Sequence, residues 1–291
     1  MPKTWFITGA SRGLGLAIAK AAVDAGDHVV AASRNREAAA QALGLHSDRL
    51  LCVDLDVTNA EAARCAAEAA LARFGSIDVL VNAAGYGHHG FFEELTLQDA
   101  RDQMETNLFG ALNVTWAVLP SMRIAQHGRI FNVSSIGGFM GGQMASLYCA
   151  SKFALEGFAE SLAKEVAPFG VHVTIVEPGP FRTDFLTAAS SRFEHAPIPD
   201  YAHRRAQFHE GIAQRNGNQP GDPQKFAQAL LHLADNAAPP LHFVAGSIAV
   251  GAAEEKLASM RADLNNWRSL SLSTDGDWDQ TDLAALHAQI K

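Results

Sequence analysis

A glycine-rich turn near the N-terminus constrains the fold of this chain more than any other stretch. The short apolar run Trp5–Thr8 leads directly into Gly9-Ala-Ser-Arg-Gly-Leu-Gly15, and an alanine-rich segment with helical spacing continues to Ala25. In a strand–turn–helix unit, the missing side chains let backbone N–H groups approach a pyrophosphate, and the positive end of the helix favours its charge. We therefore predict a dinucleotide-binding turn after a buried strand, with an ordinary tight turn as the alternative.

Strand-like and helix-like segments alternate along most of the chain. The predicted strands are 5–8, 28–33, 50–57, 77–81, 128–133, 171–176 and 241–250, and the predicted helices are 14–25, 36–43, 60–74, 106–119, 148–166, 223–235 and 252–267. This alternation predicts an α/β fold with a parallel sheet covered on both faces. We expect a doubly wound sheet of the Rossmann type in one catalytic domain, residues 1–250, followed by a C-terminal helix and tail, residues 251–291.

Three segments outside the alternating pattern, or unusually apolar within it, predict a lid, an oligomer interface and a C-terminal packing surface. From Asp184 to Asp222 the periodicity is lost, and a loop of this length is typically a substrate lid or disordered, so we predict a lid over 184–222 with disorder as the alternative. The helix 106–119 is apolar nearly all round, and we expect both its faces to be buried. Together with 148–166 it predicts a homodimer or homotetramer. The C-terminal helix carries an apolar stripe for packing on its own domain or on a partner.

Composition narrows the range of partners. With 291 residues, 48% of them hydrophobic, the chain can bury a large core. Its formal net charge is -8 and it has no run of Lys or Arg, so we expect no nucleic-acid partner. The apolar runs fall short of the ~18 residues of a membrane span. The glycine turn also starts too close to Met1 for a signal peptide, so we expect neither a membrane span nor export.

The cysteines and histidines indicate no metal centre and no disulfide framework. Cys52, Cys65 and Cys149 form no C-x-x-C pair, and their odd number fits a reducing, cytoplasmic location. The twelve histidines include no H-E-x-x-H pattern, and we expect the adjacent His88 and His89 to lie on a surface or loop segment.

The stretch from Asn132 to Lys152 carries the candidate chemistry. Tyr148 and Lys152 are four residues apart, so they project from one face of a helix. A nearby ammonium favours the phenolate and lowers the pKa of a tyrosine, which makes Tyr148 a candidate general acid/base. Ser134 and Ser135 follow a strand at its carboxyl end, where a hydroxyl could donate to a substrate carbonyl. A plain turn and a chance Tyr–Lys pair are the alternative from these residues alone.

The tip of the second predicted strand indicates the form of the nucleotide. An acidic residue there would accept from the ribose 2′-hydroxyl of NAD, whereas this chain has Ser33 and Arg34, with Arg12 in the glycine turn. Two guanidinium groups would pair with a 2′-phosphate, so NADP(H) is favoured. The alternative is that either arginine is simply solvated.

Taken together, these motifs resemble the short-chain dehydrogenase/reductase family in its branch of standard length, over roughly residues 4 to 250. Thr8–Gly15 resembles its T-G-x-x-x-G-x-G turn, Asp56-Val57 its adenine-contacting pair, Asn82–Gly85 its sheet motif, and Pro178–Thr183 its nicotinamide-holding segment. The cofactor-binding residues implied are Gly9, Ser11, Arg12, Gly13, Leu14, Gly15, Ser33, Arg34, Asp56, Val57, Asn82, Ala83, Ala84, Gly85, Tyr148, Lys152, Pro178, Gly179, Phe181 and Thr183. The long lid and tail look similar to the 17β-hydroxysteroid-dehydrogenase-like members, without establishing a steroid substrate.

The resemblance implies roles for four residues. Asn107, Ser135, Tyr148 and Lys152 fall at the positions of the family's catalytic tetrad, and the thirteen-residue interval to Tyr148 matches Ser135 rather than Ser134. Lys152 would bind the nicotinamide ribose, Ser135 the substrate oxygen, and Asn107 a water that carries protons to Lys152. The expected function is hydride transfer between NADP(H) and a carbonyl or secondary alcohol.

The expected substrate is a small, fairly apolar molecule. Phe139, Met140 and Met144 could line the cleft, or they could pack in the core. Two other functions stay open, a non-catalytic NADP(H)-binding sensor and an NAD-dependent dehydrogenase of the same family.

Overall fold

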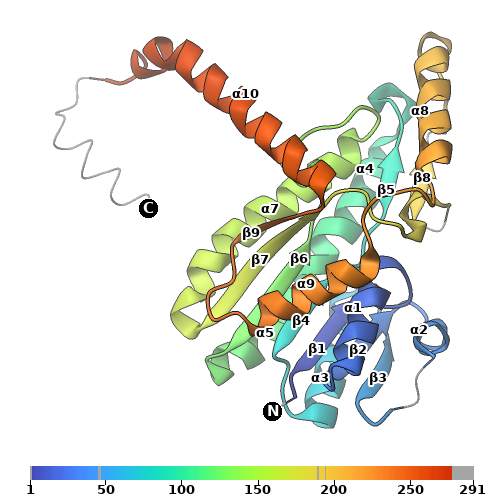
Figure 1. The fold of residues 1–291 in the computed structure, drawn as a ribbon, viewed down its shortest axis with the longest axis vertical. Helices are drawn as coiled ribbons and strands as arrows, with labels where there is room; N and C mark the ends of the chain where they lie inside the picture. The colour runs from blue at the N-terminus through green and yellow to red at the C-terminus, as the bar shows by residue number, and fades with distance from the viewer. Residues whose placement is uncertain (1, 45–46, 189, 194, 277–291) are drawn as a thin grey trace. The chain divides into compact units, whose positions relative to one another are not determined.

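The strands of the main sheet all run in one direction. The computed structural model describes residues 2–44, 47–188, 190–193 and 195–276. Within these residues, seven parallel strands form one sheet in the order β3-β2-β1-β4-β6-β7-β9 (Figure 1). They are β1 (Thr4–Thr8), β2 (His28–Ser33), β3 (Leu50–Asp54), β4 (Val79–Asn82), β6 (Gly128–Val133), β7 (Val171–Pro178) and β9 (His242–Ala245). The strand order reverses between β1 and β4, where open α/β sheets bind ligands. This confirms the predicted doubly wound fold.

Helices cover both faces of this sheet. The helices are α1 (Gly13–Asp24), α2 (Arg36–Leu43), α3 (Ala60–Phe74), α4 (Leu97–Met104), α5 (Gly110–Ala125), α6 (Ile136–Phe139), α7 (Ser146–Val166), α8 (Ala202–Arg215), α9 (Pro223–Asp235) and α10 (Ser247–Leu272). One core lies between the sheet and α1 and α9, and the second lies between the sheet and α3, α5 and α7. Strands such as β1 are buried on both faces, which explains why they read as continuous apolar runs.

Short elements complete the described chain. A separate parallel pair joins β5 (Gly87–His89) to β8 (Ser191–Phe193). A π-helical turn, Glu105–Phe109, connects α4 to α5, and single 3₁₀ turns occupy Phe92–Glu94, Ala167–Phe169, Asp184–Leu186 and Pro199–Tyr201. By length and hydropathy alone, the helical run Leu97–Ala125 could cross a membrane. Its α5 portion packs against α3 and the sheet, as core helices do.

Four expectations about these elements differ from the structure. The segment 184–222 is not without secondary structure, since it contains α8, a mostly polar and exposed helix. The last strand ends at Ala245, because Gly246 adopts φ +94° and α10 starts at Ser247. The outer face of α5 is exposed rather than buried, with Trp116 83% exposed. The third strand ends at Asp54 rather than at residue 57.

The chain divides into two compact units, Met1–Val250 and Gly251–Lys291. The second unit contains most of α10. Leu257, Met260, Leu264 and Trp267 recur along that helix at the spacing of one face, and each is more than half exposed. The helix continues to Leu272, so the predicted tail from Ser269 begins within it, and residues 277–291 lie outside the described residues.

Candidate active site

A single cleft of about 760 Å³ opens at the carboxyl ends of the central strands. It is lined at one end by the glycine turn and at the other by Ser135, Tyr148 and Lys152. The sequence-predicted residues on its wall are Gly9, Ser11, Arg12, Gly13, Leu14, Gly15, Ser33, Arg34, Asp56, Val57, Ala83, Ala84, Gly85, Ser135, Tyr148, Lys152, Pro178, Gly179, Phe181 and Thr183. The fold thus brings segments from six strand ends to one continuous surface.

The glycine turn is shaped by close backbone contacts. Gly9 and Gly13 adopt positive φ angles of 68° and 57°, which side-chain-bearing residues rarely adopt. A Cβ on Gly15 would lie 2.5 Å from the carbonyl oxygen of Gly9, so only glycine lets α1 start this close to β1. Arg12 precedes α1 and makes no side-chain cap, which leaves first-turn N–H groups of this helix available to an anion.

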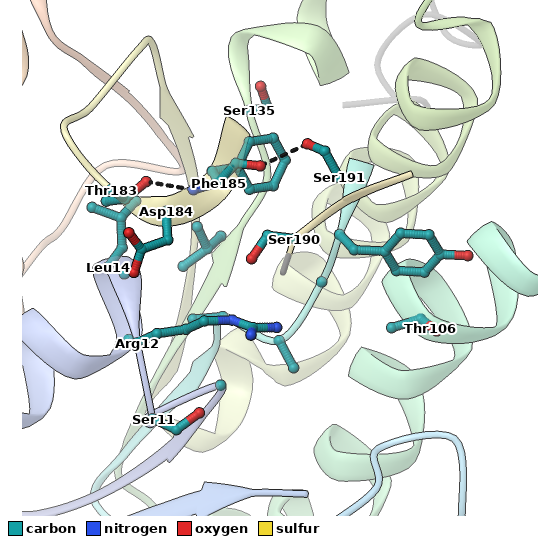
Figure 2. Close-up of a pocket in the computed structure, with 18 of the residues that line it drawn as sticks. Ser11, Arg12, Leu14, Thr106, Ser135, Thr183, Asp184, Phe185, Ser190 and Ser191 are labelled. Atoms are coloured by element: carbon teal, nitrogen blue, oxygen red, sulfur yellow. Dashed lines mark hydrogen bonds between the residues drawn. The ribbon is translucent and has the colours of Figure 1, made fainter. Parts of the chain in front are cut away.

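The positive charge at this end is available for a phosphate group. Figure 2 shows Arg12 extending into the cleft from the glycine turn, and Arg34 contributes to the same wall. Within the described residues neither guanidinium forms an ion pair, whereas the neighbouring Arg36 lies 3.5 Å from a carboxylate oxygen of Asp54. The glycines, the helix end and the two arginines therefore fit the phosphate groups of a dinucleotide.

Two of the predicted residues do not line the cleft. Asn82 is 4% exposed, and its amide nitrogen donates to Thr115 Oγ1 at 3.0 Å and to Asn132 Oδ1 at 2.9 Å. It joins β4 to α5 and β6 beneath the site. In the structure the Asn82 side chain therefore contacts Thr115 and Asn132 rather than the cleft.

Asn107 also lies behind the cleft wall, in the π-helical turn. Its Oδ1 accepts from the backbone N–H of Tyr86 at 3.1 Å, and its Nδ2 donates to the Tyr86 carbonyl and to Ser151 Oγ, both at 3.0 Å. A Cβ on Gly85 would lie 3.0 Å from Asn107 Oδ1 and 3.7 Å from Lys152 Nζ, so the amide and the amine face the same glycine. The described contacts tie the amide to the Tyr86 backbone.

The two adjacent serines have different surroundings. Ser134 is 3% exposed, and its hydroxyl donates to Glu156 Oε1 at 2.6 Å. Ser135 caps α6 by accepting from the Gly137 N–H at 3.0 Å. A Cβ on Gly137 would lie 3.3 Å from the Tyr148 ring and 3.4 Å from Ser135 Oγ, so both groups surround this glycine. Of the two hydroxyls, Ser135 is the one beside the phenol.

Burial dominates the protonation of Tyr148. It raises the pKa of the phenol to about 12, against the pull of a hydrogen bond with Ser135. The sequence predicts a lowered pKa beside Lys152, and this is wrong because Lys152 Nζ lies 6.0 Å from the ring centre and donates to the Val133 carbonyl at 2.8 Å. A phenol with a raised pKa stays protonated at neutral pH, which is the state a general acid needs.

A buried glutamate, which the sequence patterns did not single out, lies one helical turn after Lys152. Burial lowers the pKa of Lys152 to about 8, against an upward pull from Glu156. Burial raises the pKa of Glu156 to about 7, against its hydrogen bond from Ser134. The four-residue spacing from Lys152 could have identified this pair. The buried Glu177, which accepts from or shares a proton with His242 Nδ1 at 2.7 Å, further raises the pKa of Glu156.

The segment after Thr183 forms much of the remaining wall, together with Tyr86, Asp102, Glu105 and Thr106. Phe185, Leu186, Ala188, Ser190, Ser191 and Arg192 line the cleft. Figure 2 shows Thr183, Phe185 and Ser191 held together by two hydrogen bonds, from the Phe185 N–H to Thr183 Oγ1 and from Ser191 Oγ to the Phe185 carbonyl. The Tyr148 and Phe185 rings are 5.7 Å apart. Phe139, Met140 and Met144 do not line this cleft.

The adjacent histidines are not on a surface loop. His88 is 0% exposed and His89 is 7% exposed, because β5 is enclosed by α4, α7 and β8. The His89 ring packs beside Tyr148, Phe193 and Phe208, at 5.8 to 6.3 Å between ring centres. The sequence did not predict this burial, because consecutive histidines such as His88 and His89 are typical of exposed segments.

Comparisons with known proteins agree with this architecture. A family model described as short chain dehydrogenase matches residues 3–193. A 3-ketodihydrosphingosine reductase from Bacteroides thetaiotaomicron is 38% identical over 85% of this chain and 89% of its own. A solved short-chain dehydrogenase from Streptomyces avermitilis has a TM-score of 0.87 and 42% identity, over 95% of this chain and all of that one. A structure of ElxO with NADP bound has a TM-score of 0.70 and 26% identity, over 84% of this chain and 96% of that one. With these matches, the chain belongs to the short-chain dehydrogenase family of nicotinamide-dependent oxidoreductases.

Proposed function

We propose that this protein is an NADP(H)-dependent carbonyl reductase or alcohol dehydrogenase acting on a fairly apolar ketone or secondary alcohol. One observation carries the proposal: a single cleft connects the glycine turn, with Arg12 and the nearby Arg34, to Ser135, Tyr148 and Lys152. A protein that only bound the nucleotide would have no use for a protonated phenol at the far end of that cleft.

The preference for NADP(H) over NAD(H) rests on charge. Arg12 and Arg34 can pair with a 2′-phosphate, and β2 ends in Ser33 rather than in an acidic residue. The related ElxO structure contains NADP, which supports the same choice.

Four residues of this chain have distinct roles in the proposed reduction of a carbonyl. Bound NADPH would supply the hydride to the carbonyl carbon. Tyr148, protonated because burial raises its pKa to about 12, gives its proton to the substrate oxygen, and Ser135 donates a hydrogen bond to the same oxygen. Lys152 holds the ribose of the nucleotide and supplies positive charge below pH about 8. Asn107 acts as a positioning residue, since it fixes Tyr86 and the start of α7 through Ser151.

The apolar residues of the segment after Thr183 support an apolar substrate. Phe185, whose ring lies 5.7 Å from that of Tyr148, supplies apolar surface together with Leu186 and Ala188, and we assign the segment 184–222 as the substrate lid. The Bacteroides relative is named 3-ketodihydrosphingosine reductase, and reduction of a ketone by a relative supports a ketone substrate here.

We also infer a homo-oligomer and a cytoplasmic location. The exposed side chains of Phe109, Trp116 and Ile124 on α5 and its preceding turn, with Phe153 on α7, would be covered by a second copy. The three cysteines are unpaired in the described chain, as expected in a reducing compartment.

The test is a turnover screen with purified protein. NADPH oxidation would be followed with aliphatic and aromatic ketones, aldehydes and quinones, in parallel with a direct measurement of NADPH binding. We expect turnover of at least one apolar ketone. Binding of NADPH with no turnover of any carbonyl would favour a sensor, and equal kcat/KM with NADH would defeat the NADP(H) preference.

A further inference from the structure

Three potential metal ligands from distant parts of the sequence meet beside the lid. They are His88 on β5, Asp99 in the first turn of α4, and His195 just after β8, and one ligand atom from each lies within 4.8 Å of the others. We propose that this His–Asp–His cluster binds a divalent transition-metal ion, with Zn²⁺ the best match, and fastens the lid to α4 and β5.

The distances suit a tetrahedral ion. Zinc binds imidazole nitrogen and carboxylate oxygen at about 2.0 to 2.2 Å, so neighbouring ligand atoms of a tetrahedral site lie roughly 3.3 to 3.5 Å apart. Asp99 Oδ1 is 3.2 Å from His195 Nε2 and 3.7 Å from His88 Nδ1. The His195 side chain is 59% exposed and can close the remaining gap to His88. Two imidazoles and one carboxylate are a ligand set that zinc uses with a water as its fourth ligand.

Hydrogen bonds already orient the Asp99 carboxylate for metal binding. Asp99 Oδ2 accepts from the Thr96 N–H at 2.8 Å and from Thr96 Oγ1 at 2.7 Å in the capping box of α4. These bonds leave Oδ1 directed at the two imidazoles. Metal sites commonly hold their ligands in place through hydrogen bonds of this kind.

The buried ring of His88 is the strongest indication that the cluster binds a metal ion. The side chain is 0% exposed, and neither ring nitrogen makes a hydrogen bond of good geometry to the described residues. Burying an imidazole in this way is costly unless something compensates it. Burial lowers the pKa of His88, against opposing pulls from Asp99 and the Phe193 backbone, and the neutral ring is the form that binds metals.

The position of the cluster gives the ion a structural role. The cluster residues are not on the cleft wall, but β5 pairs with β8, where His88 lies opposite Arg192. Ser191 and Arg192 do line the cleft. An ion bound at the cluster would therefore stiffen the strand pair that supports this part of the wall, without contacting the reacting atoms.

Zinc titration of the full chain tests this proposal. The protein would be stripped with a chelator, exchanged into metal-free buffer and titrated with Zn²⁺, with stoichiometry from native mass spectrometry and affinity from calorimetry. We expect one Zn²⁺ per chain. His195→Ala, which alters an exposed side chain, should weaken this binding at least tenfold. His203→Ala removes an exposed histidine of α8 outside the cluster and should bind as the wild type does.

Hydrogen exchange supplies a second measurement that needs no turnover. Zn²⁺ should slow exchange of the β8 amides in the wild-type protein and in His203→Ala, but not in His195→Ala. Absence of Zn²⁺ binding by the wild type, or equal affinity in the wild type and His195→Ala, would overturn the proposal. The result is independent of the proposed reductase activity, because a protein with no carbonyl turnover could still bind the ion.

Discussion

Replacing Glu156 with glutamine tests how burial and the neighbouring Lys152 and Glu177 set the charge of this carboxyl. Burial raises the pKa of this carboxyl from its ordinary 4.5 to about 7. An acid with a raised pKa binds its proton more tightly in the folded state than in the unfolded chain. The folded protein therefore loses stability as the pH rises from 4.5 to 7, and the full cost persists above 7. Glutamine cannot ionise and avoids this cost while keeping an oxygen that can accept from Ser134.

The size of the effect follows from the same two pKa values. At about 1.4 kcal/mol per pH unit, linkage gives wild-type Glu156 a cost of roughly 1 kcal/mol at pH 5 and roughly 3 kcal/mol at pH 8. We therefore expect the free energy of unfolding of Glu156→Gln, relative to wild type, to increase by about 2 to 3 kcal/mol between these two pH values. Urea unfolding at pH 5 and pH 8 measures the difference.

A matched variant and a second measurement sharpen this prediction. Glu165→Gln makes the same change at an exposed position of α7 and should show almost no pH-dependent difference. The charge of Glu156 also holds the pKa of Lys152 up, so its loss should move the alkaline decline of reductase kcat/KM to lower pH. A stability difference between Glu156→Gln and wild type that is the same at pH 5 and pH 8 would show that burial does not raise the pKa of Glu156.

Two further predictions concern the glycine turn and the nucleotide. Arg34→Ala should lower kcat/KM for NADPH by roughly 10- to 100-fold, the value of a hydrogen bond to a charged group, while the value for NADH changes little. Arg36→Ala is the control, and an equal loss with both nucleotides would remove Arg34 from 2′-phosphate recognition. Gly15→Ala should lower the free energy of unfolding by about 1 to 3 kcal/mol, because its Cβ would lie 2.5 Å from the Gly9 carbonyl oxygen. Gly157→Ala, whose Cβ meets nothing within 4 Å, should instead stabilise α7 by roughly 0.5 to 1 kcal/mol. Equal thermal stability of the two alanine variants would contradict the packing account of Gly15.

The framework of the fold could be predicted because it depends on local patterns. The strand His28–Ser33 and the helices Arg36–Leu43 and Ala60–Phe74 have the predicted bounds, since each combines its own periodicity with a turn or cap residue at its ends. Helix α8 was missed because most of its residues are polar and exposed, so few apolar positions mark its inner face. The early end of β9 depends on the positive φ of Gly246, which an apolar run does not reveal.

The sequence predicted which helix or strand carries a site residue when a motif contains that residue. It did not predict the burial or the contacts of the side chain, because these depend on segments that are distant in sequence. The spacing of Tyr148 and Lys152 placed both on α7, but the raised pKa of Tyr148 comes from burial by other segments. In the same way, Asn107 lies behind the wall because its amide bonds to Tyr86 and Ser151, which are 21 and 44 residues away along the chain. The meeting of His88 with His195 across more than a hundred residues has no signature in sequence spacing.

The role of Tyr148 as the proton donor is the claim on which the proposed function depends. Tyr148→Phe removes one hydroxyl and keeps the ring that packs beside Phe185 and His89. With a ketone identified by the turnover screen, we predict that this variant binds NADPH as tightly as the wild type and loses at least roughly 10²-fold in kcat, the size of a general-acid contribution. An unchanged kcat with NADPH binding intact would contradict the account.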